Sequence, residues 1–231
     1  MEGGVRCSFI GNVNAITYKE MLPLIRVNKR WLSPTITSGD RELRVPDSYP
    51  LTAVDYWVDD HGNKYLLIKS VRWFADIEYG RHHEQMQLMS MEDNLRFIRH
   101  KEIRELGYSQ YDSYDVIEVG FTDAIPSDYA GVMGVPITLL DKYNPEQFDI
   151  LGATQRGCRD LAPDTKKYDD CREMKRDGTP PGSSGGKTNE NANLVMNDGK
   201  KNYVMNVEGH VVQSTYQRIF IHRHNPEPKK S

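Results

Sequence analysis

The sequence predicts an α/β fold in which an open sheet of strands and helices carries added β-hairpins and one long polar loop. Near the N-terminus, an apolar strand, a polar turn and an amphipathic helix follow one another, and this unit builds open α/β sheets. Further along, paired apolar runs flank turn-forming residues, which indicates hairpins. Residues 153–202 contain a Gly-, Pro- and Ser-rich run and an Asn-rich run, with too few apolar side chains to form a core.

The N-terminal unit begins with a short apolar run at residues 7–11, which predicts a buried strand. A polar turn follows, and then a helix that ends near Asn28. Thr17 and Glu20 have the spacing of a capping box at the start of this helix. Pro23 falls in the first turns of the helix, where its missing N–H costs least.

The middle of the chain predicts a strand–turn–strand unit over residues 55–58 and 65–68, in which Gly62 and Asn63 supply positive φ angles. Residues 70–78 predict a further strand. A helix is expected over residues 91–106, because this stretch is rich in Glu, Arg and Lys and Gly107 follows it as a stop.

Strands dominate the expected C-terminal half. Residues 137–140 and 148–151 bracket Asn144 and Pro145, which predicts another hairpin. Single strands are expected at residues 114–119, 203–207 and 216–222. The last residues, 225–231, form a tail.

The composition bounds the class of protein. The chain has 231 residues, of which 38% are hydrophobic and 10% aromatic, so a packed core is expected. The longest largely apolar run, residues 131–140, falls short of the ~20 residues that a membrane span needs. The first six residues lack the features of a secretory signal. Three cysteines (Cys7, Cys158 and Cys171) cannot form a closed disulfide framework. We therefore expect a soluble, cytoplasmic protein with no membrane partner.

The charges are unevenly distributed. Residues 1–152 hold 16 Lys and Arg against 23 Asp and Glu, whereas residues 153–231 hold 14 against 10. A basic segment on an acidic body is a weak indication of contact with a polyanion. A solvated, Lys-rich loop explains the same asymmetry equally well.

Two apparent motifs fail on inspection. Residues 182–188 resemble a phosphate-binding loop, but Pro181 stands where the motif needs Gly and no strand precedes it, so a linker is expected. His82, His83 and Glu84 are adjacent, and adjacent side chains on an extended segment point opposite ways, so no metal site is expected.

Two short stretches are candidates for a functional site. Asn12 and Asn14 lie at the carboxyl end of the first predicted strand, where open α/β sheets bind ligands. Their amides can hydrogen-bond a base edge, or they form a simple turn with Asn14 as a local cap. Asp128 and Tyr129 share one loop, and they can orient and stack a planar ligand or merely make a turn.

Several stretches resemble the EcoRI-type adenine-specific DNA methyltransferases. They are residues 11–20, 71–74, 125–148 and 216–221. The resemblance covers residues 9 to about 152 well and residues 203–223 loosely. Motifs of this length are specific to a family.

The resemblance implies transfer of a methyl group from S-adenosylmethionine to N6 of an adenine in DNA. The target base must leave the stack to reach the methyl donor. In the family, an Asn-Pro-Pro-Phe motif holds the amine by its Asn side chain and a Pro carbonyl, and an aromatic ring stacks on the base. The resemblance places Asn12 and Asn14 at the edge of the adenine and cofactor crevice, with Asp128 and Tyr129 as further candidate catalytic residues on its rim.

The sequence departs from the family at the decisive place. It contains no Asn-Pro-Pro-aromatic motif and no glycine-rich turn that would hold S-adenosylmethionine, so cofactor-binding residues cannot be assigned. In the family both precede the segment of Asn12. We therefore expect residues 1–152 to form the C-terminal half of the catalytic domain, a partial Rossmann-like methyltransferase sheet. Residues 153–202 are expected to be a flexible basic loop or insertion, and residues 203–231 the closing strands and tail.

The basic loop supplies candidate contacts to DNA phosphates, which position the duplex without reading its sequence. These candidates are Arg156, Arg159, Lys166, Lys167, Arg172, Lys175 and Arg176. A gene fragment, a split gene or a misplaced start each explains the missing motifs. The alternatives to a complete enzyme are a non-catalytic target-recognition subunit, whose separate partner subunit carries the missing motifs, and an inactive remnant. In each case the isolated chain is expected to be inactive.

Overall fold

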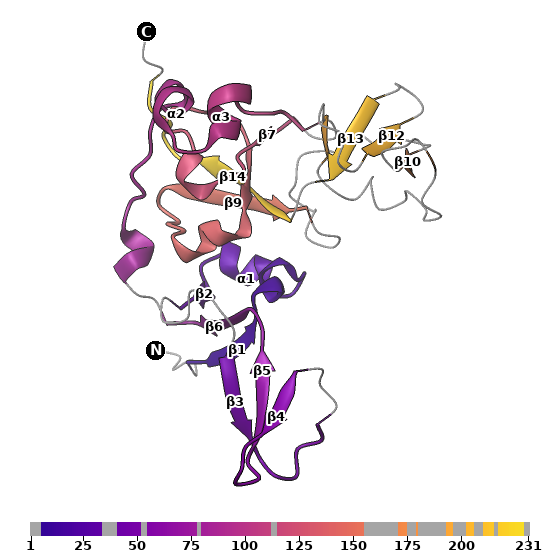
Figure 1. Ribbon diagram of the computed structural model, residues 1–231. Helices are drawn as coiled ribbons and strands as arrows, with labels where there is room; N and C mark the ends of the chain where they lie inside the picture. Colours follow the sequence, from indigo (N-terminus) through magenta and orange to yellow (C-terminus); the bar gives the residue numbers. More distant parts are fainter. Residues whose placement is uncertain are drawn as a thin grey trace.

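The computed structural model describes residues 6–33, 41–51, 55–77, 80–111, 115–154, 171–174, 179, 193–195, 202–205, 210–214 and 217–228. Within these residues the chain is a mixed α/β protein with four small β-sheets and short helices (Figure 1). No helix in the described part of the chain is long and apolar enough to cross a bilayer.

The N-terminal sheet is antiparallel, with strand order β1-β6-β2. Its strands are β1 (Ser8–Asn12), β2 (Trp31–Leu32) and β6 (Val71–Ala75). The predicted first strand therefore exists, but it lies at an edge and its residues are exposed or half-buried rather than buried. The central strand β6 supplies the apolar face, with Phe74 fully buried.

The predicted N-terminal helix is shorter than expected. Residues after β1 form the 3-10 helix η1 (Val13–Thr17), the chain is extended at Tyr18, and the helix α1 covers only Leu22–Arg26. Thr17 does not stand at the start of α1, because the N-cap residue of that helix is Met21, which makes no side-chain capping hydrogen bond. The Thr17 hydroxyl donates to the carbonyl oxygen of Asn14, 3.0 Å away, within η1. Pro23 lies at the start of α1, as predicted.

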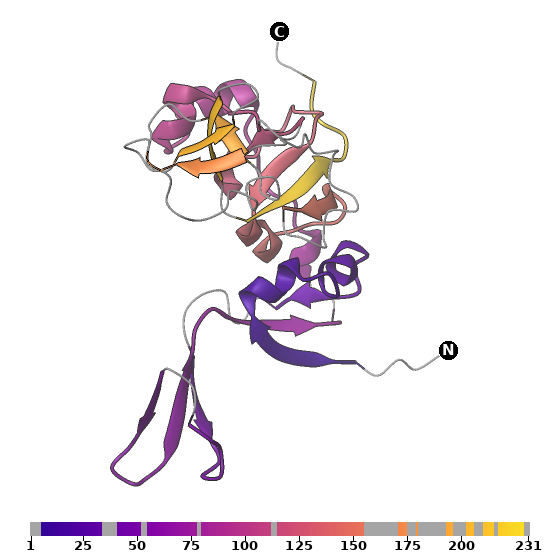
Figure 2. The same cartoon turned by 90° about the vertical axis from the view of Figure 1, so that its right-hand side faces the viewer.

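A three-stranded antiparallel sheet, which we call the arm, projects away from the rest of the molecule (Figures 1 and 2). Its strands, in the order β3-β5-β4, are β3 (Arg41–Val45), β4 (Tyr56–Val58) and β5 (Lys64–Ile68). Gly62 has the predicted positive φ, 82°, whereas Asn63 does not. The Asp59 carboxylate closes the turn instead, because it accepts hydrogen bonds from the backbone N–H groups of His61 and Asn63, at 2.9 and 2.8 Å.

The predicted helix over residues 91–106 is divided into two. The helix α2 covers Met91–Phe97 and α3 covers Lys101–Leu106. Ile98 and His100 have extended backbones between them, and the Ile98 side chain is buried in the core. Gly107 ends α3 with a φ of 73°, as predicted. A 3-10 helix, η2 (Gly80–His83), precedes this region.

The C-terminal sheet has the order β7-β8-β14-β9. Its strands are β7 (Ile117–Glu118), β8 (Met133–Pro136), β9 (Phe148–Ala153) and β14 (Arg218–Arg223). β7 and β8 are parallel, and the other two pairings are antiparallel. Two 3-10 helices, η3 (Thr122–Ala124) and η4 (Ile137–Asp141), lie in the connections.

The hairpin predicted around Asn144 and Pro145 is wrong. Residues 137–141 form η4 rather than a strand, and β9 pairs with β14. The turn itself is present, because the Asn144 side chain accepts the backbone N–H of Glu146, 2.7 Å away. Leu139 and Leu140 are buried in the core, which explains why an apolar run that suits a strand can equally form a helical turn.

A buried ion pair ties β14 to β7 across β8. The Arg218 guanidinium donates to both carboxylate oxygens of Glu118, at 2.6 to 3.1 Å, and the Tyr111 hydroxyl also donates to Glu118. The two charged side chains are only 11% and 10% exposed. Burial alone would lower the pKa of Arg218, but the hydrogen bonds and charge of Glu118 outweigh it and raise that pKa.

The fourth sheet has the order β10-β12-β13-β11 and is antiparallel. Its strands are β10 (Cys171–Met174), β11 (Asn193–Val195), β12 (Asn202–Met205) and β13 (His210–Ser214). Two of these strands lie within residues 153–202, so the stretch predicted as a loop contains regular structure. The strands β12 and β13 pair with each other, with Val204 opposite Val211, and they also pair with β10 and β11. Because these partner strands begin at or beyond residue 202, the composition of residues 153–202 does not reveal them.

One apolar core joins the N-terminal and C-terminal sheets. Its largest fully buried side chains include Ile16, Phe74, Phe148 and Ile221. β7–β8 is the only parallel pair among the described strands, so the doubly wound, Rossmann-like arrangement expected from the sequence is not shown. The core nevertheless fixes the position of the ends of β7 and β8, and a cleft opens there.

Candidate functional site

A cleft of about 360 Å³ opens at the carboxyl ends of the parallel strands β7 and β8. The carboxyl ends of parallel strands are where α/β proteins bind ligands, because the chain reverses there and leaves a crevice. We call this hollow the strand-end cleft. Residues that line it come from the connection after β7, the end of β8 with η4, and the α2–α3 connection. They are Arg99, His100, Gly120, Phe121, Thr122, Asp123, Pro136, Thr138 and Lys142.

An oriented imidazole forms the inner wall of the cleft. The His100 ring lies flat on the Phe121 ring, with centroids 3.5 Å apart and an interplanar angle of 4°. Its Nε2 atom lies 2.8 Å from the Asp123 Oδ1 atom. The Arg99 guanidinium lies 3.1 Å from the other carboxylate oxygen of Asp123. Desolvation alone would raise the pKa of Asp123, but the hydrogen bond from His100 and the charges of His100 and Arg99 lower it.

Hydroxyl groups and a lysine form the outer wall. The Thr122 and Thr138 hydroxyl oxygens lie 3.2 Å apart, within hydrogen-bond distance. Lys142 follows η4, and its side chain makes no ion pair with any residue that the structure describes. The cleft therefore presents two cations and hydroxyl donors around a carboxylate that is already paired.

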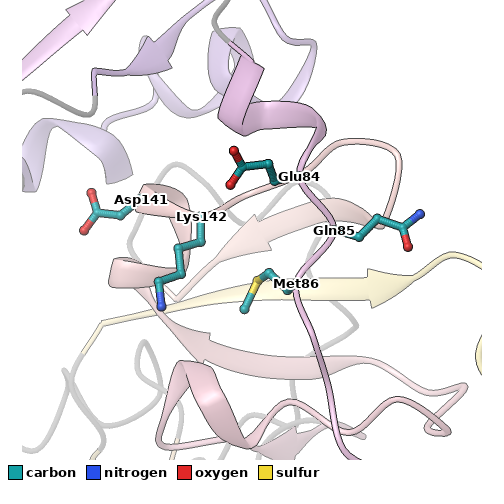
Figure 3. A pocket seen from close by; sticks show the side chains of 5 residues that line it. All are labelled: Glu84, Gln85, Met86, Asp141 and Lys142. Atoms are coloured by element: carbon teal, nitrogen blue, oxygen red, sulfur yellow. The ribbon is translucent and has the colours of Figure 1, made fainter.

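A second cavity of about 360 Å³ shares Lys142 with the strand-end cleft (Figure 3). Its other lining residues are Glu84, Gln85, Met86 and Asp141. Asp141 lies 3.4 Å from the Arg72 guanidinium of β6. Burial raises the pKa of Asp141, although the charges of Arg72 and Lys142 oppose the shift. This cavity therefore has two carboxylates where the strand-end cleft has one.

Asn12 and Asn14 form a local turn at the end of β1. The Asn12 side chain caps η1 by accepting the backbone N–H of Asn14, at 2.8 Å, and it donates to the Lys69 carbonyl at 3.3 Å. The capping residue is thus Asn12 rather than Asn14. Both side chains are exposed.

Asp128 and Tyr129 lie beside α2. The Asp128 carboxylate accepts the backbone N–H of Met91, at 2.7 Å, and so supports the first turn of α2. Tyr129 covers Gly131 so closely that a Cβ added there would lie 2.6 Å from its hydroxyl. Burial, helped by the charge of Asp115, raises the pKa of Tyr129.

The two predicted pairs are not brought together. Among the described residues, no hydrogen bond or ion pair joins Asn12 or Asn14 to Asp128 or Tyr129. None of the four lines the strand-end cleft.

Most of the predicted phosphate contacts lie outside the described residues, namely Arg156, Arg159, Lys166, Lys167, Lys175 and Arg176. The loop-like motif at residues 182–188 and Cys158 lie outside them as well. Arg172 lies in β10, where its backbone pairs with Val204. Cys7 is an exposed free thiol.

The adjacent residues His82, His83 and Glu84 make separate contacts. His82 is buried and stacks on Trp31, with ring centroids 3.7 Å apart. His83 lies 2.9 Å from a Glu146 carboxylate oxygen, and Glu84 lines the second cavity. In the part of the chain that the structure describes, no three His, Cys, Asp or Glu residues form a group that could hold a metal ion.

Sequence reasoning did not single out the residues of the strand-end cleft. The signal was available, because Phe121, Thr122 and Asp123 follow the strand predicted at residues 114–119. The same carboxyl-end argument that selected Asn12 and Asn14 applies to them. Arg99 and His100 could not be found this way, since the sequence places them inside a continuous helix.

Comparison with known proteins identifies the family. The sequence profile described as adenine-specific methyltransferase EcoRI matches residues 6–224. The type II methyltransferase M.EcoRI of Escherichia coli is 38% identical over 150 residues, which are 62% of this chain and 41% of that protein. The type II methyltransferase M.MpnI of Mycoplasma pneumoniae is 26% identical over 153 residues, 65% of this chain and 44% of that protein.

The chain thus spans less than half the length of the curated relatives that it matches. No solved structure matches it. The family profile nevertheless covers nearly all of the chain, including both strands that end at the cleft. The chain therefore belongs to the EcoRI family of adenine-specific methyltransferases, a family that methylates DNA in restriction–modification systems.

Proposed function

We propose that this chain forms the C-terminal, DNA-contacting portion of a methyltransferase that transfers a methyl group from S-adenosylmethionine to N6 of adenine in DNA. The observation that carries the proposal is the family match over residues 6–224, together with the 38% identity to M.EcoRI. The substrate of the whole enzyme is then DNA, from which the target adenine must be flipped out of the stack.

The described residues do not fit the methyl donor. S-adenosylmethionine carries a sulfonium cation, and the strand-end cleft presents the cations Arg99 and Lys142. Its carboxylate, Asp123, is already paired with Arg99 and His100. The sequence also lacks the glycine-rich turn that cradles the donor. We therefore derive no step through the donor from these residues, and we assign its site to the part of the longer relatives that lies outside the match.

On the same basis, we propose a Rossmann-like sheet. Strands from the part of the relatives that lies outside the match would complete it together with the strands of this chain. Asn12, Asn14, Asp128 and Tyr129 remain proposed residues of the adenine crevice rim. The exposure of the Asn14 amide supports its assignment, since a rim residue must be free to meet a base edge. The basic residues of the loop remain proposed phosphate contacts.

A second candidate function is a non-catalytic target-recognition subunit, which works with a separate subunit that carries the catalytic motif. It is favoured by one specific observation: the 231 residues contain no Asn-Pro-Pro-aromatic motif. Such a subunit would bind DNA without methylating it.

The experiment measures methyl transfer from labelled S-adenosylmethionine to mixed-sequence duplex DNA, with N6-methyladenine identified by mass spectrometry. The chain alone is expected to give no product. Addition of the complementary portion of a family relative, which contains the Asn-Pro-Pro-aromatic motif, is expected to restore product formation. Turnover by the chain alone would contradict the argument from the missing motif. DNA binding without restored transfer would favour the second candidate, and absence of both would contradict both candidates.

A further inference from the structure

We propose that the strand-end cleft binds one phosphate group of the DNA backbone through Arg99, Lys142 and the exposed hydroxyl of Thr138. This inference rests on the proposed function, because it takes DNA as the partner. It adds a phosphate site, formed by residues between 99 and 142, to the phosphate contacts proposed for the basic residues 156–176.

The charge balance of the cleft favours an anion. Its carboxylate, Asp123, is satisfied on both oxygens, by His100 at 2.8 Å and by Arg99 at 3.1 Å. The Arg99 side chain is 80% exposed, and its fork of five N–H donors has donors to spare after the contact with Asp123. Lys142 adds a second positive charge that no described carboxylate pairs.

The hydroxyl pair adds a neutral donor at the same place. When two hydroxyl groups hydrogen-bond to each other, one donates and the other keeps its own hydrogen. Thr138 is the exposed member of the pair with Thr122, at 3.2 Å, so its hydrogen can be directed outward. Phosphate oxygens accept from guanidinium, ammonium and hydroxyl donors of this kind.

The walls of the cleft strengthen these charges. His100 is stacked on Phe121 and only 15% of its side chain is exposed, so the inner wall excludes water. Charges beside such a wall act at a lower effective dielectric than they would in bulk water. Since Arg99, Asp123, Thr138 and Lys142 are exposed, the cleft is open to solvent and admits a phosphodiester without enclosing it.

The neighbouring cavity shows the contrast. It shares Lys142, but its lining also includes the carboxylates of Glu84 and Asp141, from which the Lys142 amine points away (Figure 3). Two carboxylates repel a phosphate, and this selects the strand-end cleft as the side of Lys142 on which an anion binds.

The test measures binding of a fluorescent duplex to the full chain, by anisotropy, between about 50 and 200 mM salt. Three proteins are compared with the wild-type chain: Lys142→Gln, the double variant Arg99→Gln/Lys142→Gln, and the control Lys19→Gln. Lys19 is an exposed lysine that pairs only weakly with Glu20, at 3.5 Å, and it lies far from the cleft in sequence. In a plot of the logarithm of affinity against the logarithm of salt concentration, loss of one phosphate contact reduces the slope by about 0.9.

The double variant is expected to lose about this much slope, with equal weakening on unrelated DNA sequences, and Lys142→Gln is expected to lose part of it. The control should keep the wild-type slope. Lys142 is exposed and has no ion pair in the described structure, so we expect Lys142→Gln to fold like the wild type. This single variant therefore tests the cleft even if the change at Arg99 disturbs the α2–α3 connection.

An unchanged slope in both cleft variants, with DNA binding retained, would overturn this inference alone. Absence of DNA binding by the wild-type chain at the lowest salt would overturn both the inference and the DNA partner in the proposed function. A parallel titration with inorganic phosphate distinguishes a phosphate of the DNA backbone from free phosphate as the ligand of the cleft. If the variants lose free phosphate but keep the DNA slope, the cleft is a free-phosphate site and the DNA assignment is wrong.

Discussion

Asp123 contacts Arg99 and His100, two of the three residues that separate α2 from α3, and its negative charge offsets part of the positive charge in the strand-end cleft. Without its carboxylate, Arg99 and His100 would have no common partner in the described contacts. The stacked position of His100 on Phe121 would then depend on ring packing alone. The residue is 47% exposed, so water screens its interactions and their net contribution is modest.

Replacement of Asp123 with Asn is expected to make stability less sensitive to acid. Because the folded-state pKa of Asp123 is lowered, its carboxylate stabilises the protein fully above the unfolded-state pKa of about 3.9. That contribution is lost as the pH falls through the folded-state pKa. Thermal unfolding at a series of pH values should show a difference of at most about 1 kcal/mol between wild type and Asp123→Asn near neutrality. A difference that persists at the acid end would contradict the assignment.

Single residues were the hardest feature to predict from the sequence. Asn12 and Asp128 were recognised as chemically suitable side chains, but the sequence does not reveal which backbone N–H each accepts. Asn12 caps the local turn at Asn14, whereas Asp128 supports the first turn of α2 at Met91. Conversely, His100 gains its surroundings from Phe121 and Asp123, more than twenty residues away. Side-chain chemistry is local, whereas the partners that decide its use are set by the tertiary fold.

At the scale of elements, β8 shows how closely a strand fits its neighbours. A Cβ added at Gly134 would lie 2.5 Å from the Tyr111 hydroxyl and 2.6 Å from its ring. Tyr111 cannot move away easily, because its hydroxyl donates to Glu118 and its ring packs edge-on against Phe220. The glycine is thus required by the close approach of an aromatic ring to the strand.

Gly134→Ala is therefore expected to destabilise the protein by about 1–3 kcal/mol, the usual cost of overpacking a core. Urea denaturation followed by circular dichroism measures the change. Gly80→Ala is the matched control, since a Cβ there meets nothing within 4 Å, and it should stay within about 0.5 kcal/mol of wild type. Equal stability of the two variants would mean that the Tyr111 ring yields.

The predicted elements were correct where a local signal was sufficient. Gly62 and Gly107 mark a turn and a helix end, and both have the positive φ that their positions require. The division of the helix over residues 91–106 was not predictable, because Ile98 leaves helical geometry to fill the core. Residues 137–140 were assigned as a strand because a short apolar run does not distinguish a strand from a helical turn.

At the scale of the whole molecule, contacts between β6 and the C-terminal part hold the two sheets together. Arg72 extends from β6 to Asp141 at the end of η4, and its side chain is only 9% exposed. Trp31, in the same N-terminal sheet, stacks on His82. Asp141 lines the second cavity, and the next residue, Lys142, lines both that cavity and the strand-end cleft. The contact between Arg72 and Asp141 therefore also sets the position of the segment between the cavity and the cleft.

A double-mutant cycle on Arg72 and Asp141 should reveal a coupling energy of about 1.5–3 kcal/mol, as for hydrogen bonds to charged groups away from water. Arg72→Met and Asp141→Asn are suitable single changes, measured by chemical denaturation. The exposed pair Glu92 and Arg96, within α2, provides the comparison and should couple by only about 0.3–0.5 kcal/mol. Similar coupling in the two cycles would refute the bridging role of Arg72.

The mixed α/β class could be predicted from the alternation of strands and helices, but the arrangement of the sheets could not. Strand pairs such as β8 with β14 join residues more than eighty positions apart, and hydrophobic periodicity carries no information about such partners. The expectation of a Rossmann-like sheet came from family resemblance. The described strands instead form four small sheets.

β14 lies between β8 and β9 although it follows every other described strand in the sequence. During synthesis on the ribosome, β8 and β9 therefore emerge well before the strand that joins them, and each waits with unsatisfied backbone groups. A nascent chain in this state is exposed to aggregation and is a natural client for chaperones. A stop codon before residue 218 would consequently leave β8 and β9 without the strand that pairs with both of them.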